Sequence, residues 1–181
     1  MSVQHMLGLY NKYRMKIMEL LESQGDIVAR ARALAIEAHR DQKYGTQPYV
    51  VHISDVVKRV MTITQDPEVI AAAWLHDVVE DTEVTIDEIR SQFGDNVANM
   101  VWAVTGEGPN RAAKMANAIA KIAQTPGAEL VKSADRLSNA AASKAEKKMG
   151  LYNRYKDEHT NLSPVLGNNQ LAQELVKLFS D

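Results

Sequence analysis

One short stretch of the chain, residues 76–81 with the sequence His-Asp-Val-Val-Glu-Asp, gathers four ionisable side chains directly after an apolar run. The preceding residues 69–75, Val-Ile-Ala-Ala-Ala-Trp-Leu, are typical of a helix that packs into a core. Burying an ionised carboxylate without a partner costs far more free energy than burying an ordinary polar group. The stretch therefore requires a cation close by, and we interpret that cation as a metal ion.

Helical spacing brings some of these side chains together. Residues four apart are neighbours on a helix surface, so His76 shares a face with Glu80. Asp77 in the same way shares a face with Asp81. The adjacent residues His76 and Asp77 diverge on a helix, so they reach one ion together only when other segments complete the site.

Candidates for these further ligands lie in two other predicted helices. His52 follows the sequence Pro-Tyr-Val-Val at residues 48–51, and Asp135 is an acid within a mostly apolar segment, residues 130–137. Taken alone, His52 has the alternative role of a helix cap or a core residue with satisfied hydrogen bonds. Asp135 alone has the alternative role of a salt-bridge partner to a nearby Arg or Lys.

The composition limits which metal ligands and which partners are possible. The chain has 181 residues, no cysteine and a formal net charge of −2. Without cysteine, a metal site must use His and carboxylate ligands. With so small a net charge there is no basic field for a nucleic-acid backbone or an anionic membrane, so we expect neither as a partner. Local Lys and Arg side chains must then hold any anionic substrate.

Apolar residues at helical spacing dominate the chain, which predicts an all-α single domain of about nine or ten helices. Residues 1–24 are expected to form an amphipathic covering helix, about 25–160 the core, and 161–181 a closing helix after Pro164. Residues 40–48 are expected to form a polar loop. Thr85 and Glu88 predict a capping box before a short helix that stops at Gly94.

Membrane and export signals are weak in this sequence. No apolar run approaches the roughly 20 residues of a membrane span. The N-terminal basic residues are not followed by a continuous apolar signal core. We therefore expect a cytoplasmic protein, and the sequence makes no prediction of its oligomeric state.

Three motifs occur in a fixed order: Pro48-Tyr49-x-x-His52, then Leu75 to Thr82, then Ala134-Asp135-Arg136-Leu137-x-Asn139. In this order they resemble the HD-domain hydrolases. More closely, the chain resembles the (p)ppGpp hydrolase domain of RelA/SpoT-type enzymes in its small single-domain form, the metazoan SpoT-homologue type. The likeness covers about residues 25–160 and implies a helical bundle.

The resemblance implies a metal-dependent hydrolysis. It implies one divalent ion, typically Mn²⁺, with four ligands: His52, His76, Asp77 and Asp135. Such a ligand set leaves open positions for water, and the ion lowers the pKa of that water. Glu80 and Asp81 are implied to be non-ligands that position or deprotonate the attacking water and act near the leaving group. The implied reaction removes the 3′-pyrophosphate of guanosine tetra- or pentaphosphate and gives GDP or GTP plus pyrophosphate.

A small, strongly anionic nucleotide is therefore the expected partner. The resemblance implies contacts from Lys43, Asn139 and Tyr155, the last of which has core packing as its alternative role. Tyr44 stands where the family usually has a second basic residue, and we expect it to stack on a base or to pack. Arg111 and Lys114, about one helical turn apart, are candidates for the phosphates, with a plain surface role as the alternative.

Three residues depart from the family pattern. Ile53 replaces a usual Pro, Ser133 a usual Leu, and Ser138 a usual His or Tyr. They lie beside the implied ligands and contact residues, so they leave metal binding intact but leave the choice of substrate open. We expect structural or surface roles for three further histidines: His5, His39 and His159.

Two alternatives remain open. The first is a related HD phosphohydrolase that acts on another nucleotide, such as NADPH or a nucleoside phosphate. The second is a catalytically silent HD module that binds a nucleotide or a partner, although the intact Glu80-Asp81 pair argues against it. No synthetase domain or C-terminal regulatory region is recognisable, so we expect a stand-alone hydrolase.

Overall fold

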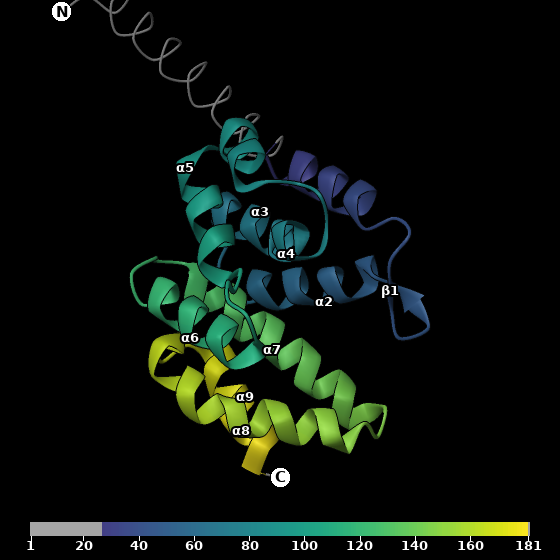
Figure 1. Cartoon of the computed structure of the whole chain (residues 1–181), viewed down its shortest axis with the longest axis vertical. Coiled ribbons are helices and arrows are strands. Elements are labelled where there is room, and N and C mark those ends of the chain that lie inside the picture. Colours follow the sequence, from purple (N-terminus) through teal and green to yellow (C-terminus); the bar gives the residue numbers. More distant parts are fainter. Residues whose placement is uncertain (1–26, 181) are drawn as a thin grey trace, which may run out of the picture.

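The computed structural model describes residues 27–180. The predicted covering helix and His5 lie outside this range. A helix over residues 27–38 opens the described part (Figure 1). It is followed by β1 (Lys43–Tyr44), β2 (Gln47–Pro48), α2 (Val50–Met61), α3 (Pro67–Leu75), α4 (Val78–Asp81), α5 (Ile86–Val104), α6 (Arg111–Ile122), α7 (Ala128–Ala145), α8 (Met149–Leu166) and α9 (Gln170–Ser180). The all-α prediction is confirmed.

Helix α3 lies in the core, as the apolar run predicts. Asp66 caps its first turn by accepting a hydrogen bond from the Glu68 N–H at 2.9 Å, and Pro67 occupies the first helical position. All seven residues 69–75 are buried. A helix that is apolar on every side must be surrounded by other elements, and α3 packs against α2, α5 and α7.

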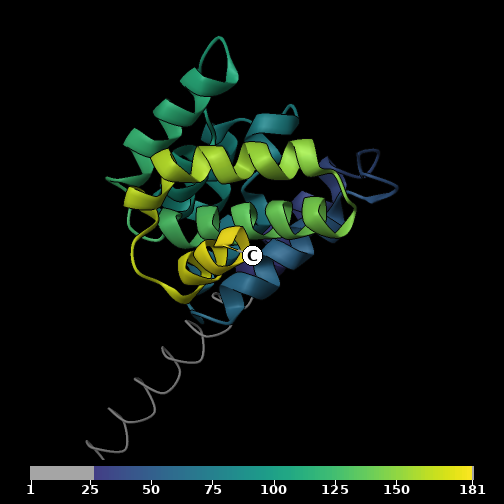
Figure 2. The same cartoon turned by 90° about the horizontal axis from the view of Figure 1, so that it is seen from below.

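Helix α7 connects the two halves of the bundle. It contacts α2, α3 and α5 on one side and α8 and α9 on the other, and α2 and α8 lie on opposite sides of it in Figure 1. The turned view in Figure 2 shows α7 and α8 running side by side. Because α7 is covered on both sides, a polar residue in its middle is buried close to α2 and α3.

Three local details differ from the sequence predictions or refine them. Residues 43–48 are not simply a loop but an antiparallel hairpin that pairs Lys43 with Pro48. The predicted stop at Gly94 is a kink inside α5, where Gly94 has φ 85° and ψ 174°. Pro164 does not open the closing helix but lies inside α8, which ends before Gly167 at φ 69°.

The closing helix is therefore α9, which begins at Gln170. Pro164 has no backbone N–H and cannot donate to the carbonyl four residues earlier, a loss that falls only two residues before α8 ends. Within residues 27–180, no helix is long and apolar enough to cross a membrane.

Candidate metal centre and its cleft

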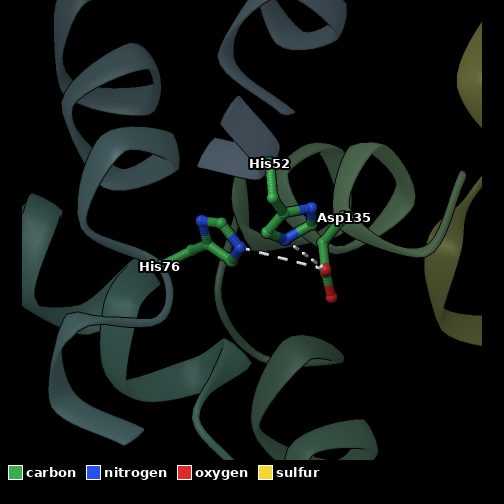
Figure 3. Close-up of side chains that lie close together, drawn as sticks. All are labelled: His52, His76 and Asp135. Carbon is green, nitrogen blue, oxygen red and sulfur yellow. Dashed lines mark ion pairs between the residues drawn. The ribbon is translucent and has the colours of Figure 1, made fainter. Parts of the chain in front are cut away.

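Three buried side chains from distant parts of the chain converge at the junction of α2, α3 and α7 (Figure 3). His52, His76 and Asp135 each offer a ligand atom, and these three atoms lie within 4.8 Å of one another. The Oδ1 atom of Asp135 lies 3.5 Å from Nε2 of His52 and 3.8 Å from Nε2 of His76. Each residue comes from a different helix or helix end, so the arrangement depends on the folded bundle.

Asp77 completes the cluster. Its Oδ2 atom lies 3.0 Å from Nε2 of His76 and 3.5 Å from Nε2 of His52. The chain is not one continuous helix here, because α3 ends at Leu75 and α4 begins at Val78. His76 and Asp77 lie between these two helices with αR backbone angles, and both side chains reach one cluster that His52 and Asp135 from other helices complete.

The histidine rings are held by their Nδ1 atoms. Nδ1 of His76 lies 2.8 Å from the Ala73 carbonyl oxygen, which is an acceptor, so this nitrogen carries the proton. Nε2 of His76 then presents a lone pair to the cluster; it is buried and lies 3.0 Å from Oδ2 of Asp77, but it makes no hydrogen bond to that atom or to any other described residue. Nδ1 of His52 lies 3.2 Å from the Ser138 hydroxyl. Two oriented imidazoles and two carboxylates fit a divalent first-row ion.

The charges in the cluster favour a cation. Burial lowers the pKa of His52, but hydrogen bonds and charges from Asp135 and Asp77 outweigh burial and raise it to about 9. Burial raises the pKa of Asp135, yet Lys132 and the two histidines together hold it well below its usual range. Without a metal, a proton on His52 thus supplies the positive charge that the two carboxylates need.

The cluster borders a cleft of about 270 Å³. Eight of the residues that the sequence singles out for the site line this cleft: Asp77, Glu80, Asp81, Arg111, Lys114, Asp135, Asn139 and Tyr155. His52 and His76 are buried beneath it. Glu80 and Asp81 therefore lie beside the cluster, in the same space in which a substrate would meet it.

Two other predicted contacts lie outside this lining. Lys43 is exposed on β1. Tyr44 reaches the site from the side: its hydroxyl donates to Oδ1 of Asn139 at 2.8 Å, and its ring stacks on His52 with centroids 4.7 Å apart. Tyr44 thus packs on a candidate metal ligand, and its role toward a base stays a prediction.

The candidate phosphate-binding cations already have carboxylate partners. Nζ of Lys114 lies 3.1 Å from Oε1 of Glu80. Arg111 donates two hydrogen bonds to Glu158, from Nε at 2.5 Å and from Nη2 at 3.0 Å. An incoming phosphate must therefore compete with these carboxylates or bind the donors that they leave free.

Sequence reasoning gave no role to two further residues of the cleft. The Tyr49 hydroxyl lies 2.7 Å from Oδ2 of Asp77 and 3.0 Å from Oδ2 of Asp81. Lys132 donates from Nζ to Oδ2 of Asp135 at 3.0 Å. The available signal was proximity in sequence, because Tyr49 stands within the first motif and Lys132 three residues before Asp135.

Comparison with known proteins places these observations in a family. The family model for the HD domain matches residues 31–162. The guanosine-3′,5′-bis(diphosphate) 3′-pyrophosphohydrolase MESH1 of Homo sapiens is 38% identical over 127 residues, which are 65% of this chain and 69% of that protein. The pyrophosphohydrolase of Aquifex aeolicus is 35% identical over 130 residues, 68% of this chain but 19% of that protein. The chain thus spans about a fifth of that relative's length.

Solved structures agree with this placement. One is of a metazoan orthologue of SpoT described as hydrolysing ppGpp; it matches with a TM-score of 0.75 at 27% identity, covering 85% of this chain and 94% of that one. A protein of Listeria monocytogenes EGD-e matches with a TM-score of 0.63 at 25% identity, covering 74% of this chain and 96% of that one. With the ordered motifs, the buried His and Asp cluster and the family match over residues 31–162, this chain belongs to the HD domain family.

Proposed function

We propose that this chain is a metal-dependent hydrolase that removes the 3′-pyrophosphate of guanosine 3′,5′-bis(diphosphate) and of the pentaphosphate, giving GDP or GTP and pyrophosphate. The observation that carries the proposal is the convergence of two histidines and two aspartates beside a cleft that also holds Glu80 and Asp81. The pyrophosphohydrolases among the relatives support the choice of substrate, above all the human protein, of which the chain covers 69%.

In this proposal the four residues of the cluster, His52, His76, Asp77 and Asp135, hold one divalent ion, Mn²⁺ or another first-row metal. Two nitrogen and two oxygen donors suit such an ion. When bound, the ion supplies positive charge to the reacting phosphate and lowers the pKa of water.

Glu80 and Asp81 take the proton-handling roles. Water attacks the phosphorus that is bonded to the ribose 3′-oxygen, that P–O bond breaks, and the 3′-oxygen leaves with a proton. Burial, together with the charges of Asp77 and Glu80, raises the pKa of Asp81, although the Tyr49 hydrogen bond partly opposes this. A carboxyl with a raised pKa is suited to hold the proton for the leaving oxygen, so Glu80 is assigned to the water.

The remaining assignments concern the nucleotide. Arg111, Lys114, Asn139 and Tyr155 line the cleft and are proposed to contact it, with Lys43 and Tyr44 approaching from the hairpin side. Lys114 then has a second role, because a phosphate that draws it away from Glu80 leaves the Glu80 carboxylate free to act on the water. This coupling links substrate binding to the state of the proposed base.

A substrate panel tests the proposal. Purified protein is assayed with Mn²⁺ against ppGpp, pppGpp, NADPH and nucleoside triphosphates, and released pyrophosphate and phosphate are measured separately. We expect pyrophosphate from the first two nucleotides and little release from the others. Hydrolysis of NADPH or a triphosphate, with no pyrophosphate from ppGpp, would contradict the substrate assignment and support the related-nucleotide alternative.

Two variants test the assigned roles in the same assay. His76→Ala should lose stoichiometric metal, because it removes a ligand whose Nε2 faces the cluster. Glu80→Gln should keep the metal and lose activity by about 100-fold or more, the usual effect of removing a general acid or base. A Glu80→Gln protein with wild-type turnover would remove Glu80 from the mechanism and favour another base.

A further inference from the structure

One carboxylate, Glu158 on α8, is bound by arginines from two other helices. It accepts the two hydrogen bonds of Arg111 from α6 and a third from Nη1 of Arg136, on α7, at 2.8 Å. Both arginines line the cleft, whereas Glu158 lies behind them and lines an apolar groove between α6 and α8. The carboxylate therefore ties together the three helices that form this wall of the cleft.

Burial makes this contact necessary. Arg136 is 3% exposed, and a buried guanidinium without a counter-charge is strongly destabilising. Two guanidinium groups beside one cleft also repel each other unless an anion lies between them. Burial opposes ionisation of Glu158, but the hydrogen bond from Arg111 and the charges of both arginines outweigh it and lower its pKa. Glu158 thus carries the negative charge that allows both cations to occupy this wall.

The same carboxylate fixes an aromatic ring. Tyr155 lies three residues before Glu158, so the two share a face of α8. The guanidinium carbon of Arg111 lies 5.7 Å from the centre of the Tyr155 ring, and that of Arg136 lies 4.7 Å from it. Because both arginines are fixed by Glu158, the ring that both of them contact is also held in place.

Donors remain for a ligand. Arg111 uses Nε and Nη2 for Glu158, so within residues 27–180 its Nη1 group makes no hydrogen bond. Nε of Arg136 is buried and has no hydrogen-bond partner among the described residues. A bidentate contact with a carboxylate orients a guanidinium group as well as neutralising it. The wall thus carries a net positive charge, and the guanidinium groups that provide it have a fixed orientation.

We propose that Glu158 is a positioning residue for phosphate recognition, holding Arg111, Arg136 and Tyr155 as one clamp on the wall of the cleft. We call these four residues the Glu158 clamp. The ligand class is a phosphate group of a polyanionic nucleotide. The identity of that nucleotide rests on the proposed function above, whereas the clamp itself does not.

The alternative is that Glu158 acts through its charge alone. The two hypotheses predict opposite changes in KM when Glu158 is removed. A negative charge near the cleft weakens the binding of anions, so its removal would lower KM if charge were all that mattered. Under the clamp hypothesis, removal of Glu158 frees Arg111 to move and raises KM despite the added positive charge. The direction of the change in KM therefore separates them.

The test compares Glu158→Gln and Glu158→Ala with Asp157→Asn. Asp157 is the exposed neighbour on the same helix, so its variant removes one negative charge without touching the arginines. With ppGpp and Mn²⁺, we expect KM to rise about tenfold in Glu158→Ala and less in Glu158→Gln, which keeps one acceptor oxygen. We expect kcat to stay within about threefold, and Asp157→Asn to leave both constants near wild type. An unchanged or lower KM in the Glu158 variants would overturn the proposal.

Two further measurements separate positioning from a loss of folding. Thermal melting identifies any variant that is unfolded at the assay temperature. Glu158→Gln is a milder change than Glu158→Ala because it still has an acceptor for Arg136.

In an Arg111→Lys background, Glu158→Gln should add little to KM, because the bidentate contact is already lost. Full additivity of the two changes would show that Glu158 does not act through Arg111.

A binding measurement keeps the clamp testable if the proposed function fails. Inorganic pyrophosphate is titrated by calorimetry into the metal-free wild type, Glu158→Gln and Asp157→Asn. We expect about threefold weaker binding in Glu158→Gln and near wild-type affinity in Asp157→Asn. Equal affinities in all three proteins, or no binding by the wild type, would contradict the clamp, whereas absent ppGpp hydrolysis with this pattern intact would contradict only the choice of substrate.

Discussion

At the scale of single residues, the candidate ligands are held by neighbours outside the set of four. The Ala73 carbonyl fixes the ring of His76, and the Tyr49 hydroxyl contacts Asp77. Asp135 accepts hydrogen bonds from Lys132 and from Asn139, the latter at 2.6 Å. Such partners orient ligands and set their basicity, so their removal has effects out of proportion to their size.

Tyr49 offers the sharpest test of this support, because its hydroxyl reaches both Asp77 and Asp81. We expect Tyr49→Phe to lower kcat about 10- to 100-fold, since Asp77 and Asp81 both lose the hydroxyl that contacts them while the ring still stacks on His39. Steady-state kinetics at saturating Mn²⁺, together with metal analysis, measure this.

Tyr152→Phe is the matched control. Its hydroxyl donates to the Leu178 carbonyl at 2.6 Å, and it is not among the residues that line the cleft. Activity in this variant should stay near wild type. If both tyrosine variants lost activity equally, the hydroxyl of Tyr49 would have no specific role.

The sequence indicates the candidate ligands but not the side chains that pair across the cleft. His52, His76, Asp77 and Asp135 stand in short motifs, and a motif identifies them without a structure. The contact of Arg111 with Glu158 joins residues 47 positions apart, and that of Lys114 with Glu80 joins residues 34 apart. Ion pairs between helices depend on how the helices pack, which spacing along one segment does not indicate.

At the scale of elements, helix α7 determines where Asp135 lies, and one glycine fixes where α7 begins. Gly127 precedes α7 at φ 90°, a conformation that L side chains rarely adopt. A Cβ atom there would lie 2.7 Å from Sδ of Met100 and 3.3 Å from Cγ2 of Val69. The start of α7 is thus held closely against residues of α5 and α3.

Gly127→Ala should therefore destabilise the protein by about 1–3 kcal/mol, through backbone strain and crowding. For a protein of this size, that lowers the melting temperature by several degrees. Gly150→Ala is the control, because Gly150 lies in α8 with no atom within 4 Å of the added Cβ. Alanine at that helical position should be neutral or slightly stabilising. Equal melting temperatures for the two variants would contradict this explanation of Gly127.

Apolar spacing predicted the positions of most described helices, but it did not predict the breaks inside polar segments. The end of α3 at Leu75 is the important case, because the sequence pattern continues as a helix through residue 81. The cluster requires α2 and α7 to bring His52 and Asp135 to His76 and Asp77, which lie between α3 and α4 with αR backbone angles. That requirement comes from tertiary packing around the cluster and is not visible in local propensity.

At the scale of the whole molecule, protonation of the cluster affects the stability of the metal-free protein. Folding raises the pKa of His52 from 6.5 to about 9, so the folded state binds this proton more tightly than the unfolded state does. The resulting stabilisation of the metal-free protein is fully present below about pH 6.5 and is lost as the pH rises through about 9.

We therefore expect the free energy of unfolding of the metal-free protein to fall between about pH 7 and pH 9, by up to about 3 kcal/mol. Urea unfolding in the presence of a chelator measures it across this range. His52→Asn, which lacks the titrating group, should show a flatter profile. A wild-type protein that gains stability over this range would contradict the assignment of the proton to the cluster.

We propose that the buried cluster of His52, His76, Asp77 and Asp135 is a metal centre at which ppGpp is hydrolysed. The most direct measurement titrates Mn²⁺ into metal-free protein while bound metal and pyrophosphate release from ppGpp are followed in the same samples. We expect release to rise in proportion to occupancy and to saturate at one ion per chain. Full activity in a chelator, or an occupied site without pyrophosphate release, would contradict this assignment of the cluster.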